Sequence, residues 1–232
     1  MSYDRLRVAL IGTGRISDLH AIEYCQNPHT EIVAVCDRDT GSARRRASAW
    51  GVENARVVDD YRTILADPEI DLVEILLPHN LHCSVALAAI EAGKAVSLQK
   101  PMCLDLVEAD RVVEAAAHAR APVKVFENFI FYPPVMKAKT LVDEGAIGTP
   151  LTIRIKSNPG RSQTAWSVPH AADAWRQERS QSGGGPLVFD DGHHKFALAW
   201  HFMGNPEEVH AFIGETERPD GFYFDAPAIV SF

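Results

Sequence analysis

One stretch near the N-terminus indicates the fold most clearly. It reads Leu6-Arg7-Val8-Ala9-Leu10-Ile11-Gly12-Thr13-Gly14-Arg15-Ile16-Ser17. It begins as a short, nearly continuous apolar strand, which breaks at the two glycines. Apolar residues at helical spacing follow in residues 16–25, and a second apolar strand, residues 31–36, leads to Asp37. This strand–helix–strand order predicts the first βαβ unit of a doubly wound parallel sheet.

The glycines and Asp37 have the chemistry of a dinucleotide site. Gly12 permits a tight turn, Gly14 lets a pyrophosphate approach the backbone, and a helix that starts after Ile16 offers free N–H groups. Asp37 lies 23 residues after Gly14, where a carboxylate can accept hydrogen bonds from the adenosine ribose. We therefore expect the turn 12–16, which includes Thr13 and Arg15, and Asp37 to bind NAD.

Composition narrows the classes of protein further. The 232 residues are 46% hydrophobic with a net charge of −8, and neither a basic stripe for nucleic acid nor an apolar run of the ~20 residues that span a membrane is present. No secretory leader is evident. The four cysteines lack CxxC spacing, which favours free thiols in a reducing cytoplasm over disulfides or a metal site.

The pattern of elements changes near residue 125. Before it, short apolar strands at 57–58, 71–77, 95–98 and 123–126 alternate with helices, which predicts a Rossmann domain over residues 1–125. After it, strand-like segments at 151–157, 209–214 and 228–232 surround two helices, 133–142 and 193–203. We expect residues 126–232 to form an α+β domain with a mostly antiparallel sheet. Because the last segment is a strand in progress, a truncated domain and an unusually short version of the fold are both open.

Lys100 is a candidate for proton transfer. It follows a predicted parallel strand at the sheet edge where ligands bind, and Pro101 gives its backbone a defined, extended direction. A desolvated lysine beside a hydroxyl or carbonyl group can move that group's proton. A solvent-exposed lysine at a strand end explains the same residues equally well.

The run Asp190-Asp191-Gly192-His193-His194 is a second candidate. Asp190 and His194 are four residues apart, so on a helix they share a face, and a carboxylate can fix a histidine's tautomer. An ordinary helix N-cap and a metal site made by Asp190, His193 and His194 are alternatives. Arg154 and Arg161 could meet an anionic substrate group, and Trp175 is typical of a core or a pocket wall.

Together these segments resemble the glucose–fructose oxidoreductase / inositol dehydrogenase / MocA family over essentially the whole chain. The resemblance rests on four segments, which are Ala9–Gly14, Pro78–His82, Ala92–Lys94 with Gln99-Lys100-Pro101, and Gly183–Gly185 with Asp190–His194. It implies an NAD(P)-dependent oxidoreductase that acts on a sugar, a polyol or a related ring. It also implies a homodimer or homotetramer formed through the C-terminal sheet.

The resemblance assigns roles to particular residues. Lys100 and His194 would be the catalytic acid/base groups, and Asp190 would hold the substrate beside them. The further cofactor contacts would be Arg38, Pro78, Asn80, His82 and Gln99. The further substrate contacts would be Asn128, Tyr132, Arg154, Trp175 and His193. No metal is implied.

The chain also departs from the family pattern. Ser17 stands where a third glycine is usual, and Gln99 stands where the family has glutamate. Asp37 favours NAD because it repels a 2′-phosphate, whereas the neighbouring Arg38 leaves NADP possible. A non-catalytic NAD-binding sensor on the same fold, a metal-assisted lyase or isomerase, and an inactive fragment are the rival hypotheses.

Overall fold

The computed structural model describes residues 5–157, 170–217, 219, 221 and 223–232. The chain divides into two compact units, Met1–Phe126 and Glu127–Phe232. No helix within the described residues is long and apolar enough to cross a membrane.

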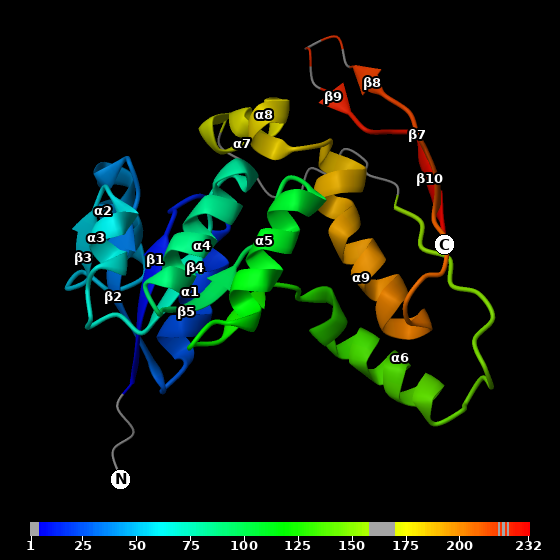
Figure 1. Cartoon of the computed structure of the whole chain (residues 1–232), viewed down its shortest axis with the longest axis horizontal. Helices are drawn as coiled ribbons and strands as arrows, with labels where there is room; N and C mark the ends of the chain where they lie inside the picture. The colour runs from blue at the N-terminus through cyan, green and yellow to red at the C-terminus, as the bar shows by residue number, and fades with distance from the viewer. Residues whose placement is uncertain (1–4, 158–169, 218, 220, 222) are drawn as a thin grey trace. The chain divides into compact units, whose positions relative to one another are not determined.

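The first unit is a six-stranded parallel sheet in the order β3-β2-β1-β4-β5-β6 (Figure 1). Its strands are β1 Leu6–Ile11, β2 Thr30–Cys36, β3 Arg56–Val58, β4 Leu72–Ile75, β5 Ala95–Leu98 and β6 Val123–Val125. Its helices are α1 Ser17–Gln26, α2 Thr40–Ala49, α3 Tyr61–Leu65, α4 His82–Glu91 and α5 Leu106–Ala117, with the 3₁₀ turn η1 at His79–Leu81. The expected Rossmann topology is confirmed.

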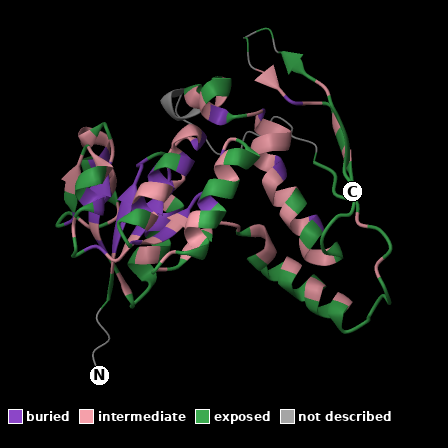
Figure 2. Cartoon of the chain, in the orientation of Figure 1, coloured by how far each residue is buried: buried purple, intermediate pink, exposed green. Residues whose placement is uncertain are grey.

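Both faces of this sheet are covered, which explains the continuous apolar strands. Val8 and Leu10 of β1 pack in one cluster with α1 and α2, whereas Ala9 and Ile11 point the other way into a second cluster with α4 and α5. All four are at most 1% exposed. Figure 2 shows the buried residues gathered in the strands of this unit. Because successive side chains of a strand alternate between faces, a strand covered on both sides must be apolar throughout.

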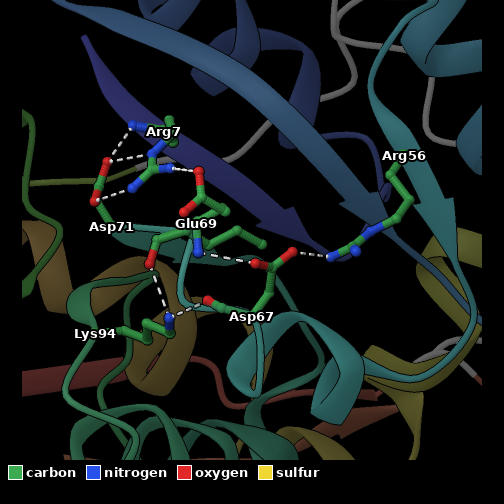
Figure 3. Close-up of polar contacts among 7 residues, drawn as sticks. Arg7, Arg56, Asp67, Glu69, Asp71 and Lys94 are labelled. Carbon is green, nitrogen blue, oxygen red and sulfur yellow. Dashed lines mark hydrogen bonds and ion pairs between the residues drawn. The ribbon is translucent and has the colours of Figure 1, made fainter. Parts of the chain in front are cut away.

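A polar network ties together the amino ends of the central strands (Figure 3). Arg7 donates to Asp71 from its backbone nitrogen at 2.8 Å and from its side chain at 3.2 Å, and it also pairs with Glu69. Lys94, which precedes β5, donates to the carbonyl oxygens of Asp67 and Ile70. Structural contacts thus occupy the edge of the sheet at the amino ends of the strands. The opposite edge carries the carboxyl ends of the strands.

The second unit contains helices and two small antiparallel sheets. Its helical elements are η2 Phe129–Phe131, α6 Pro133–Asp143, α7 His170–Gln177, α8 Arg179–Ser182, the π-helix η3 Pro186–Asp191 and α9 Gly192–Met203. Strand β7 His210–Ile213 pairs with β10 Ala228–Ser231, and β8 Thr216–Glu217 pairs with β9 Tyr223–Phe224. The α+β class is confirmed for the described residues.

One expected strand is wrong. Residues 151–157 form neither a helix nor a strand, and most of them are exposed. Leu151, Ile153 and Ile155 have the alternation of a strand, yet alternation gives a strand only where another strand supplies hydrogen bonds. Within the described part of the chain, no strand pairs with this segment.

Candidate functional site

The parallel order of the sheet brings the predicted cofactor residues to one edge. Gly12 follows β1, Asp37 follows β2, Pro78 lies beyond β4, and Gln99 with Lys100 follows β5. Strands β1 and β4 are neighbours although they are not consecutive, so the strand order reverses between them. In open α/β sheets, ligands bind outside the carboxyl ends of the strands at such a switch point.

The two glycines at this edge have different structural reasons. Gly12 has φ +102°, and a Cβ added to it would lie 2.4 Å from the carbonyl oxygen of Leu76, so only glycine fits between β1 and the end of β4. A Cβ on Gly14 would meet nothing within 4 Å, and this residue is exposed. Gly14 therefore borders open space at the start of α1.

Ser17 shows how the turn accommodates a residue larger than glycine. Its side chain is fully buried, and its hydroxyl donates to the carbonyl oxygen of Gly14 at 2.5 Å. Its backbone N–H reaches the same oxygen at 3.1 Å. The hydroxymethyl group is thus held against the turn, which leaves the start of α1 intact.

Asp37 is oriented by the turn that it faces. Its Oδ2 accepts from the backbone nitrogen of Thr13 at 2.8 Å and from the Thr13 hydroxyl at 2.7 Å. Its Oδ1 accepts from the backbone nitrogen of Asp39 at 3.0 Å. A carboxylate has about four acceptor positions, so these three bonds fix its direction and leave about one position for a ribose hydroxyl. Arg38 beside it is exposed.

The residues after β4 have two different roles. Asn80 has a buried Oδ1 that accepts no hydrogen bond within the described residues, so a ligand could supply the missing donor. His82, in contrast, is 0% exposed, and its ring nitrogens lie 2.8 Å from Leu77 O and 2.7 Å from Pro101 O. We therefore revise the expected cofactor contact of His82 to an internal link between the ends of β4 and β5.

Lys100 is partly exposed at the end of β5, and its backbone nitrogen donates to the side-chain oxygen of Gln99 at 2.8 Å. Gln99 itself is buried and turned inward, where its Nε2 lies 3.0 Å from His20 Nε2. Lys100 thus lies at the carboxyl edge of the sheet, whereas the Gln99 side chain supports its backbone from inside the protein.

In the second unit, the structure supplies a carboxylate that the sequence did not suggest. His194 Nδ1 lies 2.9 Å from Glu127 Oε2, and His193 Nε2 lies 3.2 Å from the same oxygen. Glu127 also accepts from the backbone nitrogen of Phe129 at 2.6 Å, and the Phe129 ring stacks on His194 with centroids 4.1 Å apart. Because a carboxylate at Nδ1 keeps the proton on that nitrogen, Nε2 becomes the basic nitrogen of His194.

Asp190 is held from another helix, since Arg176 of α7 lies 3.3 Å from its Oδ2. The π-helix that carries it is anchored by buried Asp225, which accepts from the backbone nitrogens of Leu187, Val188 and Phe189 at 2.6–3.0 Å. A Cβ on Gly185 would lie 2.1 Å from Asp225 Cγ. Gly184 and Gly185 are therefore closely packed, since a Cβ on Gly184 would also lie 2.5 Å from Phe189 Cβ.

The other expected substrate residues are less fixed. Asn128 and Tyr132 flank η2 and are exposed, and Trp175 stacks with the guanidinium of Arg176 at 4.4 Å. Arg154 lies in the exposed segment 151–157, so the expected strand no longer supports its role. Arg161 lies outside the described residues.

A group of side chains that could hold a metal lies in the first unit. Within the described residues, the one cluster with ligand atoms close enough for a metal is Cys83, Cys103 and Glu108. Burial raises the pKa of the Cys103 thiol to about 12, which opposes the thiolate that a metal needs. The cluster does not include Asp190, His193 or His194, so the geometry gives no support to the metal-assisted alternative.

Comparisons with known proteins identify the family of the chain. Residues 6–127 match the family model GFO_IDH_MocA, described as an oxidoreductase family with an NAD-binding Rossmann fold. Residues 135–232 match the GFO/IDH/MocA C-terminal domain. The sequence is 31% identical to levoglucosan dehydrogenase of Pseudarthrobacter phenanthrenivorans over 92% of this chain and 56% of that protein. It is 30% identical to D-glucoside 3-dehydrogenase of Escherichia coli over 89% of this chain and 56% of that protein.

Solved structures show the same fold. An NAD binding oxidoreductase from Klebsiella pneumoniae has a TM-score of 0.75 and 28% identity, over 97% of this chain and 63% of that one. An oxidoreductase from Agrobacterium radiobacter in complex with NAD⁺, L-tartaric acid and magnesium has a TM-score of 0.78 and 22% identity, over 97% and 62%. The chain spans a little over half the length of the two curated relatives.

Proposed function

Because the chain belongs to the GFO/IDH/MocA family of NAD-binding oxidoreductases, we propose that it transfers a hydride between a nicotinamide cofactor and a sugar or polyol. The observation that carries the proposal is the pair His194–Glu127, whose nitrogen and carboxylate oxygen are 2.9 Å apart. A sensor that only binds NAD has no use for a histidine oriented by a carboxylate, whereas oxidation of a hydroxyl group must remove a proton.

The carboxyl edge of the first unit suits the cofactor. Gly12, Gly14 and the start of α1 would hold the pyrophosphate, with Thr13, Arg15 and Ile16 in the same turn. Asp37 would accept the ribose hydroxyls and favour NAD over NADP, although the exposed Arg38 beside it leaves NADP open. Pro78, Asn80 and Lys100 would lie toward the nicotinamide. When bound, the nicotinamide supplies the position that accepts or returns the hydride.

Two side chains would manage the proton. Glu127 keeps the proton of neutral His194 on Nδ1, so Nε2 can take the proton of a substrate hydroxyl group during oxidation and return it during reduction. Lys100, at the carboxyl edge of the first unit, would be the other acid/base group of the reaction. Asp190, His193, Asn128, Tyr132 and Trp175 would orient the substrate.

The wider roles follow from the same proposal. Residues 1–125 would bind the dinucleotide, and residues 126–232 would bind the substrate and form a homodimer or homotetramer. Strands β7 and β10 support an interface because Phe212 and Ile229 are 65% and 72% exposed. The four free cysteines support a reducing, cytoplasmic location.

Turnover of two variants tests the proposal. A screen of sugars and polyols with NAD and NADP, followed by NADH absorbance, would first identify a substrate. His194→Ala should then lower turnover by roughly 10²–10⁴-fold because it removes the acid/base group, and Lys100→Ala should lower it comparably. His201→Ala, which removes a histidine from the last turn of the same helix, is the control and should retain activity. Near wild-type turnover in both test variants would overturn the assignment.

A further inference from the structure

A buried chain of polar side chains runs from the middle of the sheet to the backbone of Lys100. Lys100 N–H donates to Gln99 Oε1 at 2.8 Å, and Gln99 Nε2 lies 3.0 Å from His20 Nε2. His20 Nδ1 in turn lies 3.1 Å from Glu74 Oε1 on β4. The other oxygen of Glu74 accepts from the hydroxyl of Tyr24 at 2.5 Å. The chain thus connects β5, α1 and β4 beneath the cofactor edge.

The two contacts of the Gln99 amide determine which nitrogen of His20 carries the proton. Gln99 Oε1 accepts from Lys100, so the Gln99 Nε2 must be the amide's donor and must point its hydrogen at His20. His20 Nε2 therefore accepts, which requires a neutral ring with its proton on Nδ1. That nitrogen lies 3.1 Å from Glu74 Oε1, a distance typical of an ion pair, although the two atoms do not have the geometry of a hydrogen bond. The Gln99 amide thus links the Lys100 backbone to a neutral His20 beside the carboxylate.

Burial makes this arrangement costly to disturb. Glu74 is 1% exposed, His20 7% and Gln99 9%, so none of them can replace a lost partner with bulk water. Burial and the charge of Glu74 raise the pKa of the Tyr24 hydroxyl, which keeps it protonated and donating. The His20 ring also packs against Phe126, with centroids 4.5 Å apart.

We propose that His20 and Glu74 are positioning residues. They hold the backbone of Lys100 through the side chain of Gln99, and His20 does so as a neutral ring protonated on Nδ1. The inference rests on the proposed role of Lys100 in hydride transfer. Lys100 lies between two anchored neighbours, since His82 contacts the carbonyl oxygen of Pro101 at 2.7 Å on the other side. The side chain of Lys100 would then leave a fixed backbone at the cofactor edge.

The amide of Gln99 is what makes a neutral histidine fit. A carboxylate at this position would place an acceptor 3.0 Å from His20 Nε2, and that nitrogen would then need a proton. The ring would become an imidazolium between two carboxylates. The substitution Gln99→Glu is therefore expected to change the protonation state of His20 while it changes hardly any volume.

Nitrogen NMR of histidine-labelled chain, without cofactor, tests the protonation state. We expect a neutral His20 protonated on Nδ1 at neutral pH, identified by loss of its signals in His20→Asn. In Gln99→Glu the same ring should become doubly protonated. A wild-type ring protonated on Nε2, or on both nitrogens, would overturn the proposal.

Hydrogen exchange of the Lys100 amide tests the positioning role. His20→Asn does not touch that amide, yet it should speed its exchange by about two- to tenfold because Gln99 loses its inner partner. Two controls accompany it, His29→Asn at an exposed histidine and Ile64→Ala at a buried side chain of α3. Unchanged exchange in His20→Asn, or an equal change in Ile64→Ala, would contradict the positioning role.

A kinetic comparison then connects the network to the reaction. In His20→Asn, kcat should fall by about two- to tenfold while the Kd for NADH changes by less than about twofold. Wild-type chain without any turnover would refute the proposed function and leave the NMR and exchange results to decide the network. Normal kcat in His20→Asn, with active wild-type protein, would refute the connection to Lys100.

Discussion

Different kinds of interaction stabilise the interior of each of the two units. Among the described residues, the buried hydrophobic side chains belong almost entirely to the first unit, and only Ala199 belongs to the second. In the second unit Phe212 and Ile229 are more than half exposed, and order near the predicted active residues comes from the polar anchors Asp225 and Glu127. The first unit is thus stabilised mainly by buried hydrophobic surface area, and the second by a few specific polar contacts.

This difference explains what each unit can contribute. A sheet covered on both faces fixes the edge at which a dinucleotide binds. A histidine oriented by Glu127 and stacked on Phe129 depends instead on short-range contacts at one place. Substitutions in the two units should therefore have effects of different size.

The largest effect is expected at Gly12. In Gly12→Ala, the new Cβ would lie 2.4 Å from Leu76 O at φ +102°, between two strands that cannot separate. We expect a loss of more than about 3 kcal/mol in the free energy of unfolding, or failure to fold. Urea denaturation followed by circular dichroism measures it.

The matched control for that variant is Gly14→Ala, whose Cβ meets nothing within 4 Å. Its free energy of unfolding should stay within about 0.5 kcal/mol of wild type. Equal stability of the two variants would contradict the close contact of β1 with the end of β4.

An intermediate effect is expected at Gly185. Gly185→Ala drives a Cβ into Asp225, whose carboxylate binds three backbone nitrogens of the π-helix. We expect a loss of about 1–3 kcal/mol, confined to the second unit. Tryptophan fluorescence reports it, since three of the four tryptophans lie in that unit.

A second variant distinguishes the steric clash in Gly185→Ala from the effect of the Asp225 charge. Asp225→Asn preserves the shape of the side chain and removes the charge that attracts those nitrogens, so it should destabilise the second unit less than Gly185→Ala does. If the first unit lost stability equally in either variant, the contrast between the units would be wrong.

The smallest effect is expected in the stability of the protein at low pH. The hydrogen bond from Arg7 lowers the pKa of Asp71 below its ordinary value of 3.8. A depressed carboxyl pKa contributes stability above the unfolded value, and this contribution is lost as the pH falls through the folded value. Both side chains are about one-third exposed, so we expect less than about 1 kcal/mol.

Arg7→Met tests this contribution. Its free energy of unfolding should be lower than that of wild type at neutral pH, and the difference should shrink below pH 3.8. A difference that is constant with pH would show that Arg7 stabilises the strand ends by packing rather than by charge.

Much of the first unit could be predicted from the sequence because its hydrophobic pattern and glycines specify local structure. The strand Leu6–Ile11 has the expected bounds, and Gly12 and Lys100 lie at the expected edge. The motif around His82 does not reveal that this side chain is 0% exposed. A charged Glu74 inside the apolar strand β4 was a signal of an internal polar network, although its partner His20 is 54 residues away.

The second unit was harder to predict for a physical reason. Glu127 and His194 are 67 residues apart, and only the fold brings them together. The alternation at 151–157 indicated a strand, yet pairing depends on a partner that the periodicity does not name. Asp225, which holds the π-helix, had no local pattern to identify it.

The most direct test of the central claim is an NADH titration of wild-type chain and Gly14→Ala, followed by nucleotide fluorescence. If the dinucleotide lies against the turn after β1, wild type binds NADH, and Gly14→Ala weakens binding by about tenfold or more while stability is unchanged. Equal affinities in two equally stable proteins would contradict the claim that this edge holds the cofactor.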